Sequence, residues 1–410
     1  MVSPINWPER FADLKREIVA ATPDYERRLT ESWNDLLQEL DERTTEIADE
    51  GPNVVYPSSP FSITWTRWSL SSSMIFDARA SIIIHGVVEE GEAASWKTAL
   101  EDVIKANPHV EGRPWVIQNK TSNSSSFTWT RAQVQARAHP NVLKVSTWLN
   151  NLYRAKTGKK MEGVNLDVPL VYADRFRIRH PGVQWDDHPP RVDDILSGNW
   201  RQHDPYELEG RLDAHASLCG RPGQATVFRT FQGWLAMSET APTQGTLKVF
   251  PDVPLSNAYT ILRPFFRPTV PLDSKDILDP KNWVFDISTP DFPGIQPQDS
   301  GWVDLRPTPD LHPHLRLHDT MTSVPKDVVH SVEQEHTGSR DFAVMYIPAV
   351  PQTPQNTAYV KRQAETFLAG TNPPDFASDG TGLPYIGLGV DADIIQPISR
   401  IAMGLPVAVA

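Results

Sequence analysis

The sequence predicts an α+β protein in which a layer of helices packs on the outside of a core made mainly of strands. Helical periodicity dominates residues 1–155, whereas short alternating patterns that are typical of strands dominate the chain from there to residue 355. The chain contains 37 prolines among 410 residues, and they are scattered, which favours ordered loops between strands over a disordered tail. A helical front on a β core is the simplest architecture that fits these observations.

Composition narrows the class of protein. The formal net charge is -12 and the pI is about 5.5, which argues against a surface that binds nucleic acid through its phosphates. Cys219 is the single cysteine, so the chain forms no internal disulfide and suits a reducing compartment. No stretch has the pattern of a secretion signal or the apolar length of a membrane span. We therefore expect a soluble, cytoplasmic protein with no nucleic-acid or membrane partner.

The helical part follows from periodic apolar residues. A first helix is expected after Pro8, which suits the first position of a helix. A second helix is expected over residues 24–49, where leucines and aromatic residues lie on one face. A further amphipathic helix is expected over residues 90–107, and shorter ones over 131–139 and 142–155.

Strands are expected mainly in the second half of the chain. Residues 168–178 form the first convincing strand there, and residues 342–347 alternate between two apolar sets on opposite faces. A final helix is expected over residues 357–369. These elements divide one domain into a helical region at residues 1–160, a β core at residues 161–355, and a C-terminal helix and tail at residues 356–410.

Residues 226–250 form the stretch around which the chain is organised, and they read as a β-hairpin at the centre of the core. Two alternating runs are separated by a turn with proline and glycine, and the second run ends before Pro251. Arg229 and Gln232 are polar groups that a central strand holds only if they meet partners or a ligand. The alternative is two strands of an ordinary β-sandwich, and the pattern leaves open which face points inward.

Histidines and carboxylates are the first candidates for a metal site. His188 lies in a segment rich in aspartate that continues to Asp193, and His330 lies far along the chain. Two histidines and one carboxylate on one side of a barrel form the facial ligand set that holds Fe(II) and leaves positions open. The alternative for any single histidine is solvation or a structural hydrogen bond, and we assign that alternative to His312 and His314.

Arg340 is a candidate for binding a carboxylate. It lies ten positions after His330 and opens the alternating strand expected over residues 342–347. A guanidinium that is fixed at the start of a strand is a good two-pronged partner for a dicarboxylate. The alternative is a salt bridge at the rim, with Asp341 or Glu333 as its partner.

Several segments resemble a known family. ARAHPNVL, RIRHPG, SGNWRQHDPYE, VFRTFQGWLAMS and HTGSRDFAVMYIPAVP resemble the YbiU-like family of bacteria and fungi, which is placed among the 2-oxoglutarate oxygenase-like barrels. More broadly, an Asp-rich loop, then WLAMSETAPTQGTLKVFP, then a histidine and an arginine that opens a strand is similar to Fe(II)- and 2-oxoglutarate-dependent oxygenases of the phytanoyl-hydroxylase and clavaminate-synthase kind. The resemblance covers residues 11–405. It implies a double-stranded β-helix core, a jelly-roll or cupin-like barrel, with an N-terminal helical layer.

One segment departs from the pattern that the resemblance implies. A His-x-Asp motif is expected shortly after RIRHPG, but Arg191, Val192 and Asp193 stand in its place, and the segment after it looks shortened. The motif that leads to His330 is better kept. This combination indicates either a local deletion, from a faulty gene model or an isoform, or a degenerate active site.

The resemblance also implies roles for individual residues. His330 matches the distal metal ligand, Asp193 matches the metal carboxylate, and Arg340 matches the arginine that binds the carboxylate of 2-oxoglutarate. The proximal histidine has no clean match, and His188 is its nearest substitute.

The implied function is that of an oxygenase that uses Fe(II) and 2-oxoglutarate to hydroxylate a small organic substrate. Arg229 and Gln232 are expected to line the pocket that holds the co-substrate. The alternative is a non-catalytic barrel that binds a carboxylated metabolite through its arginines without iron turnover. A third reading, a truncated product that folds poorly, follows if the altered segment removes part of the barrel.

Overall fold

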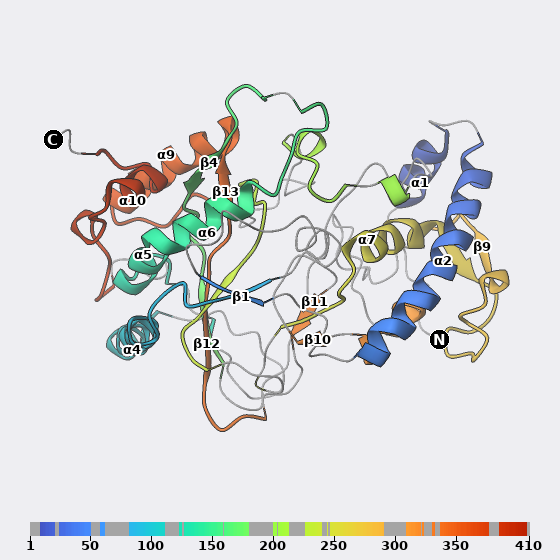
Figure 1. Cartoon of the computed structure of the whole chain (residues 1–410), viewed down its shortest axis with the longest axis horizontal. Helices are drawn as coiled ribbons and strands as arrows, with labels where there is room; N and C mark the ends of the chain where they lie inside the picture. Colours follow the sequence, from blue (N-terminus) through green and yellow to red (C-terminus); the bar gives the residue numbers. More distant parts are fainter. Residues whose placement is uncertain are drawn as a thin grey trace.

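The computed structural model describes most of the chain, and every structural statement concerns the residues that it describes (Figure 1). These are residues 9–20, 24–50, 58–61, 82–110, 123–124, 127–158, 160–179, 200–202, 204–212, 226–239, 244, 247–290, 309–320, 322–323, 330–332, 337–376 and 385–407. Within them, no helix is both long enough and apolar enough to cross a membrane.

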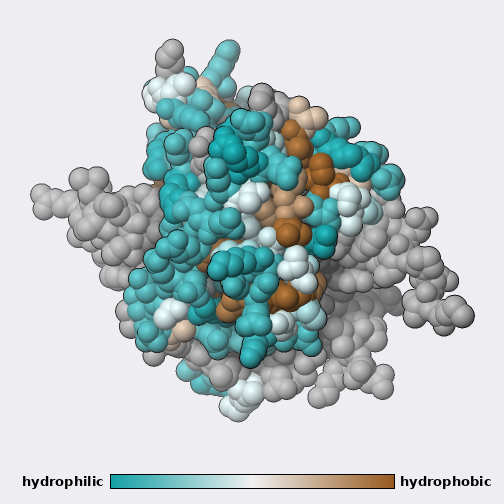
Figure 2. All heavy atoms as spheres, turned by 90° about the vertical axis from the view of Figure 1, so that its right-hand side faces the viewer, coloured by the Kyte–Doolittle hydropathy of each residue, from teal (hydrophilic) through white to brown (hydrophobic). Residues whose placement is uncertain are grey.

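Two N-terminal helices, α1 (Arg10–Ala20) and α2 (Tyr25–Glu50), lie on one side of the molecule (Figure 1). The apolar residues of α2 recur at helical spacing and are buried against α7 (Val253–Leu262), β8 (Phe266–Pro268) and β9 (Trp283–Phe285). Trp33 is the centre of this core, because its ring stacks on Phe266 at 4.6 Å and on Tyr259 at 5.4 Å between centroids. Hydrophilic side chains cover most of the described surface on this side, and hydrophobic ones gather near the middle (Figure 2).

Three arginines form ion pairs at the polar face of α2, two from other parts of the chain and one from the helix itself. Arg201 pairs with Asp35 and Glu39, Arg316 pairs with Asp41, and Arg43 of the helix itself reaches Asp252. These ion pairs join α2 to the beginning of α7, to the residue before α8 (Leu317–Thr320) and to the segment near Trp200.

A second group of helices covers a sheet of four strands. α4 (Glu90–Ala106) and α5 (Arg131–Arg137) pack against it, and α6 (Pro140–Asn150) follows directly after α5. The sheet has the order β3-β5-β12-β6 and is antiparallel throughout. Its strands are β3 (Asn123–Ser124), β5 (Phe176–Arg179), β12 (Phe342–Tyr346) and β6 (Trp234–Ala236).

A three-stranded antiparallel sheet has the order β10-β7-β11 and lies near the centre of Figure 1. The remaining pairs are β4 with β13, β8 with β9, and the parallel pair β1 with β2. The bounds of these strands are β1 (Ser58–Pro60), β2 (Ile83–His85), β4 (Asn165–Leu170), β7 (Leu247–Val249), β10 (Thr322–Ser323), β11 (His330–Val332) and β13 (Val350–Gln352). The helices α9 (Pro354–Leu368) and α10 (Pro397–Ala402) complete the chain.

The expected helices are confirmed with small shifts at their ends, in α1, α2, α4, α5, α6 and α9. The strand expected over residues 342–347 is confirmed as β12. Two expectations are wrong. Residues 226–250 do not form a hairpin, because β6 pairs with β12 whereas β7 pairs with β10 and β11 in another sheet. Residues 168–178 do not form one strand, because β4 and β5 belong to different sheets.

The described strands form five small sheets. The jelly-roll barrel and the three-part division of the chain therefore stay predictions.

Candidate functional site

The four-stranded sheet has two chemically different faces. One face carries Phe176, Ile178, Ala343 and Met345, all buried in a single apolar cluster with Trp96 of α4 and with alanines of α5. Because side chains alternate along a strand, the residues between them point to the opposite side. This second face carries Arg177, Trp234, Phe342, Val344 and Tyr346, and it is the candidate site.

Strand pairing and ring contacts place these five side chains together. Arg177 pairs with Val344, and Trp234 pairs with Tyr346, so each pair shares a face. The Trp234 ring meets Phe342 edge-on at 5.7 Å and Tyr346 at 5.9 Å between centroids. Arg177 is only 4% exposed. The second face therefore combines an aromatic wall with a buried cation, which is a composition typical of small-ligand sites.

The chain path brings β11 towards this face. Trp234 packs in a small apolar cluster with Val253, the first residue of α7. Val253 follows Val249 by four residues, a span of at most about 14 Å even when the chain is fully extended. Val249 pairs directly with His330. The backbone of His330, the predicted distal metal ligand, therefore pairs with β7. The chain continues from β7 into α7, whose first residue packs near Trp234.

The structure places the predicted metal ligands only in part. His188 and Asp193 lie outside the described residues, and of His330 the backbone in β11 is described. Within the described ranges, no three His, Cys, Asp or Glu side chains form a group that could hold a metal ion. The predicted set of two imidazoles and one carboxylate has the donor chemistry that suits Fe(II).

Arg340 lies at the rim of the site. It precedes β12 by two residues, and its guanidinium pairs with Glu239, which follows β6. Both side chains are largely exposed, 72% for Arg340 and 62% for Glu239. Of the alternative partners expected for Arg340, Asp341 lies instead 3.9 Å from Lys97 and Glu333 is outside the described residues.

Arg229 lies at the other end of β12. Its guanidinium is 4.0 Å from Asp174, which stands just before β5, and the neighbouring Arg175 carbonyl accepts a hydrogen bond from the Tyr346 backbone N–H. Six residues separate Arg340 from Tyr346, or about 20 Å along an extended strand. The structure therefore does not bring Arg229 and Arg340 together on one small co-substrate.

Asp174 has a second cationic neighbour. Burial lowers the pKa of Arg137 to about 10, and the carboxylate of Asp174 opposes that shift. Arg137 therefore stays charged at neutral pH, and it donates a 2.9 Å hydrogen bond to the Thr128 carbonyl. The cluster around Asp174 is thus an internal electrostatic link between α5 and the loop before β5.

Gln232 is half-buried between Phe231 and Gly233, in the segment that leads into β6. Two backbone hydrogen bonds join that segment to the one around Ala349. The Thr230 N–H donates to the Ala349 carbonyl, and the Ala349 N–H donates to the Phe231 carbonyl. A Cβ on Gly233 would stand 2.7 Å from the Ile347 carbonyl oxygen, so glycine permits this close approach. These contacts fix the position of Trp234.

His312 and His314 are both buried near α2, and the structural role expected of them is seen at His314. His314 lies 3.4 Å from the Tyr259 hydroxyl and edge-on to Trp33. Burial is the main cause that lowers the pKa of His314 to about 3, and the positive charge of the nearby Arg263 adds to it. The His314 ring is therefore neutral at physiological pH.

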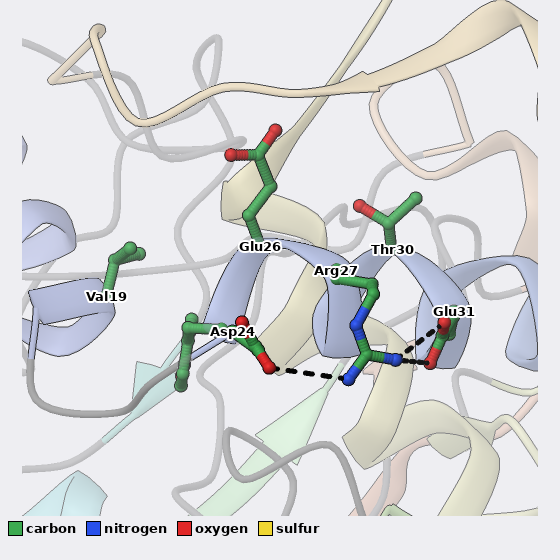
Figure 3. A pocket seen from close by; sticks show the side chains of 7 residues that line it. Val19, Asp24, Glu26, Arg27, Thr30 and Glu31 are labelled. Atoms are coloured by element: carbon green, nitrogen blue, oxygen red, sulfur yellow. Dashed lines mark hydrogen bonds and ion pairs between the residues drawn. The ribbon is translucent and has the colours of Figure 1, made fainter.

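An open hollow lies between α1 and α2 (Figure 3). Its charged side chains pair with one another, since Arg27 contacts both Asp24 and Glu31. Exposed pairs of this kind contribute little and mark a solvated surface. None of the residues that line it belongs to the four-stranded sheet.

Sequence reasoning missed Arg177. The sequence signal that could have found it is a charged residue between two apolar ones, Phe176 and Ile178, within a strand. Alternation along the strand then puts the arginine on the face away from those two side chains. Because those two neighbours pack under α4 and α5, Arg177 points to the other face.

Comparisons with known proteins agree over most of the chain. The protein YbiU of Escherichia coli (strain K12) is 28% identical over 351 residues and covers 77% of each chain. The crystal structure of GlcNAc Inducible Gene 2 from Candida albicans is 26% identical, with a TM-score of 0.78, and covers 98% of this chain and 90% of that one. A crystal structure from Salmonella typhimurium LT2, whose name assigns it provisionally to the oxidoreductases, is 24% identical, with a TM-score of 0.74 and coverage of 96% of both chains.

The family model described as Gig2-like matches in two pieces, residues 5–194 and residues 184–405. The pieces overlap in the segment that contains His188 and Asp193, where the sequence departs from the expected pattern. Together they span nearly the whole chain, and this chain therefore belongs to the Gig2-like family.

Proposed function

We propose that the protein is an oxidoreductase of the Fe(II)- and 2-oxoglutarate-dependent type, which hydroxylates a small organic substrate. The observation that carries the proposal is the relation between β11 and β12. His330 begins β11 of the three-stranded sheet, and ten residues later Arg340 precedes β12 at the centre of the other sheet. These two antiparallel sheets would form the two halves of a jelly-roll barrel. The name of the Salmonella relative supports the same class of reaction.

His188, Asp193 and His330 would hold the metal in this proposal. When bound, Fe(II) with 2-oxoglutarate supplies the activation of O₂, and the protein supplies ligands, orientation and a dry pocket. The altered segment around Asp193 makes His330 the best-supported ligand of the three.

The second face of the four-stranded sheet would form the wall of the pocket. Trp234, Phe342 and Tyr346 present ring surfaces that exclude water from the reacting atoms. Val344 is fully buried in the middle of this face and adds an apolar floor. This face has two arginines, Arg340 at its exposed edge and Arg177 in its buried middle. A guanidinium at either position can form paired hydrogen bonds with a carboxylate.

The proposal is tested by anaerobic titration of the purified protein with Fe(II) and 2-oxoglutarate. Chelation of iron by 2-oxoglutarate gives a weak visible charge-transfer band, which we expect in the wild type and not in His330→Ala. His109→Ala is the matched control, because His109 is an exposed histidine outside both sheets. A folded wild-type protein without the band, or a band that His330→Ala leaves intact, would contradict the proposal.

A second candidate function is a non-catalytic protein that binds a carboxylated metabolite. The observation that favours it is the break of the family match within residues 184–194, the segment that would supply two of the three metal ligands. In that case the folded protein binds dicarboxylates but gives no charge-transfer band with Fe(II). The titration above therefore distinguishes the two functions.

A further inference from the structure

We propose that an exposed apolar patch around α10 is the surface through which two copies of this chain form a symmetric dimer. α10 lies at the opposite end of the molecule from α1 and α2 (Figure 1). Among the described residues, eight large hydrophobic side chains are exposed, and seven of them lie in the last part of the chain, from Leu368 onward. Five of these seven form the α10 patch and are 36–80% exposed: Val390, Ile395, Ile398, Ile401 and Val407. Exposed apolar surface that is contiguous marks an interaction site.

Arg400 of α10 holds the parts of the α10 patch together. Its guanidinium donates to the carbonyls of Asp391 and Ile394, and it also pairs with the Asp391 carboxylate at 3.0 Å. Its Nε donates to the Pro406 carbonyl at 2.6 Å. Each of the five patch residues lies within two positions of Arg400 or of one of these three acceptors. The five apolar side chains therefore gather around one point of the surface.

α10 turns its small residues inward and its large ones outward. Ser399 and Ala402 are buried, and the Ser399 hydroxyl donates to the Ala138 carbonyl at the end of α5. Ile398 and Ile401 are three positions apart, which makes them neighbours on one side of a helix, and both are exposed. A surface helix ordinarily buries its large apolar residues and exposes its polar ones. The reversal in α10 indicates that its outer side has a partner of its own.

The charges at the border of the α10 patch favour a second copy of the chain as that partner. Residues 385–407 contain three charged residues, and all are paired: Arg400 with Asp391, and Asp393 with Arg131 of α5 at 2.7 Å. The whole chain carries a formal net charge of -12, so two copies repel each other over most of their surfaces. At the patch, two cations and two anions balance, so two copies can approach there.

The balance of charge also separates a second copy from a membrane surface. An anionic membrane attracts clusters of lysine and arginine, and the border of the α10 patch has no excess of either. A two-fold interface sets a patch against itself, so it needs both signs of charge at its border. Arg131 is 67% exposed and Asp391 is 47% exposed, so the border offers an accessible charge of each sign.

The size of the α10 patch fits a homodimer. From their exposed fractions, the five residues present about 500 Å² of mainly apolar surface. Because the interfaces of homodimers are about 65% apolar, this area corresponds to an interface of about 800 Å² on each partner. That is the standard size for a stable complex between two proteins.

The test measures the mass of the purified full-length protein by size-exclusion chromatography with light scattering. At about 10 µM, above the micromolar limit for interfaces of this size, we expect twice the mass of one chain. Ile395→Glu and Ile398→Glu each put a carboxylate into the patch, and the two-fold axis brings each substitution into the interface twice. Because a buried carboxylate without a partner is costly, we expect association at least about 100-fold weaker and the mass of one chain.

Leu14→Glu is the matched control. Leu14 is 39% exposed and Ile398 is 40% exposed, but Leu14 belongs to α1 at the other end of the molecule (Figure 1). We expect Leu14→Glu to keep the mass of two chains, and circular dichroism checks the folding of all variants. Hydrogen exchange of the wild type needs no substitution. We expect the amides of residues 386–407 to exchange faster once dilution has separated the dimer.

A wild-type protein with the mass of one chain would overturn the inference, and so would a dimer that survives both isoleucine substitutions. A dimer in which exchange at residues 386–407 does not change on dilution would also overturn it, because another surface would then join the two copies. Binding to phosphatidylcholine vesicles is the remaining alternative. A monomeric wild type that binds such vesicles, and loses this binding in Ile398→Glu, would assign the α10 patch to a lipid surface and not to a second copy.

Discussion

Thr230→Val tests how the segment before β6 is held in place. Thr230 is buried, and its hydroxyl donates a 2.6 Å hydrogen bond to Asn150 Oδ1 of α6, whose side chain is also fully buried. The backbone contacts of Thr230 remain in the variant, because Ala349 O also accepts the Thr230 N–H at 3.0 Å and Thr230 O accepts the Tyr153 hydroxyl. Valine has nearly the shape of threonine, so the substitution removes the bond to Asn150 and a longer 3.1 Å contact from the hydroxyl to Ala349 O, which keeps the Thr230 N–H as a donor.

The expected cost follows from the acceptor that is left behind. Asn150 Oδ1 would lose its Thr230 donor in a site without access to water, and such a loss costs about 1–3 kcal/mol. The extra buried methyl group offsets part of that, so we expect a net loss of about 1–2 kcal/mol in the free energy of unfolding. Urea denaturation measures it as a lower midpoint at an unchanged slope.

The matched control is Thr157→Val. The Thr157 hydroxyl donates an equally short 2.6 Å bond to Glu209, but this threonine is exposed. We expect a change of less than about 0.5 kcal/mol there, because water replaces the lost partner. Equal effects of the two substitutions would refute the reasoning, and so would a stabilised Thr230→Val protein.

The α2 core gives two further predictions. Trp33→Ala removes a ring that stacks on Phe266, so we expect the free energy of unfolding to fall by about 3–5 kcal/mol in a denaturation experiment. The control, Leu14→Ala at an exposed position, is expected to lower it by less than about 0.5 kcal/mol. Similar losses in the two variants would mean that α2 is not anchored through Trp33. The second concerns pH. Because the folded-state pKa of His314 is lowered to about 3, the unfolded chain takes up a proton below pH 6.5 that the folded protein refuses, and stability falls as the pH falls through that window. From pH 6.5 to pH 5 this amounts to about 2 kcal/mol. We expect urea denaturation of His314→Gln to show a smaller loss over that range, and an identical pH dependence in both proteins would contradict the assignment.

Amphipathic helices could be predicted from the sequence because their apolar residues repeat along one face. α2 is the clearest case, since its buried residues from Leu29 to Ile47 follow helical spacing while the opposite face is charged. α7 was missed for the opposite reason. Its sequence VPLSNAYTIL is buried on nearly every side, so no polar face marks the period.

The pairing of strands could not be read from alternation. β6 and β7 each alternate and are joined by a turn with proline and glycine, which is typical of a hairpin, yet each pairs with strands from the last quarter of the chain. Long-range pairing depends on which faces must be buried together, and a short strand carries little of that information. The same limit explains why β4 and β5 read as a single strand, although they join different sheets.

The metal ligands expected from the sequence stay predictions, and the candidate site on the sheet comes from the structure. Arg229 and Gln232 were expected to line a pocket, and the structure places the nearby Trp234 beside Tyr346 and Phe342. Of the two arginines on that face, Arg177 is buried and Arg340 is exposed. The spacing between His330 and Arg340 gives no information about this difference in burial. Arg177 emerges only when the two faces of the sheet are separated by their packing.

The most direct test of the account is a crystal structure of the protein grown anaerobically with Fe(II) and 2-oxoglutarate, with anomalous scattering measured at the iron edge. The account predicts an iron peak at the His330 imidazole, together with 2-oxoglutarate bound beside it. An iron peak away from His330, or no iron peak at all, would contradict it.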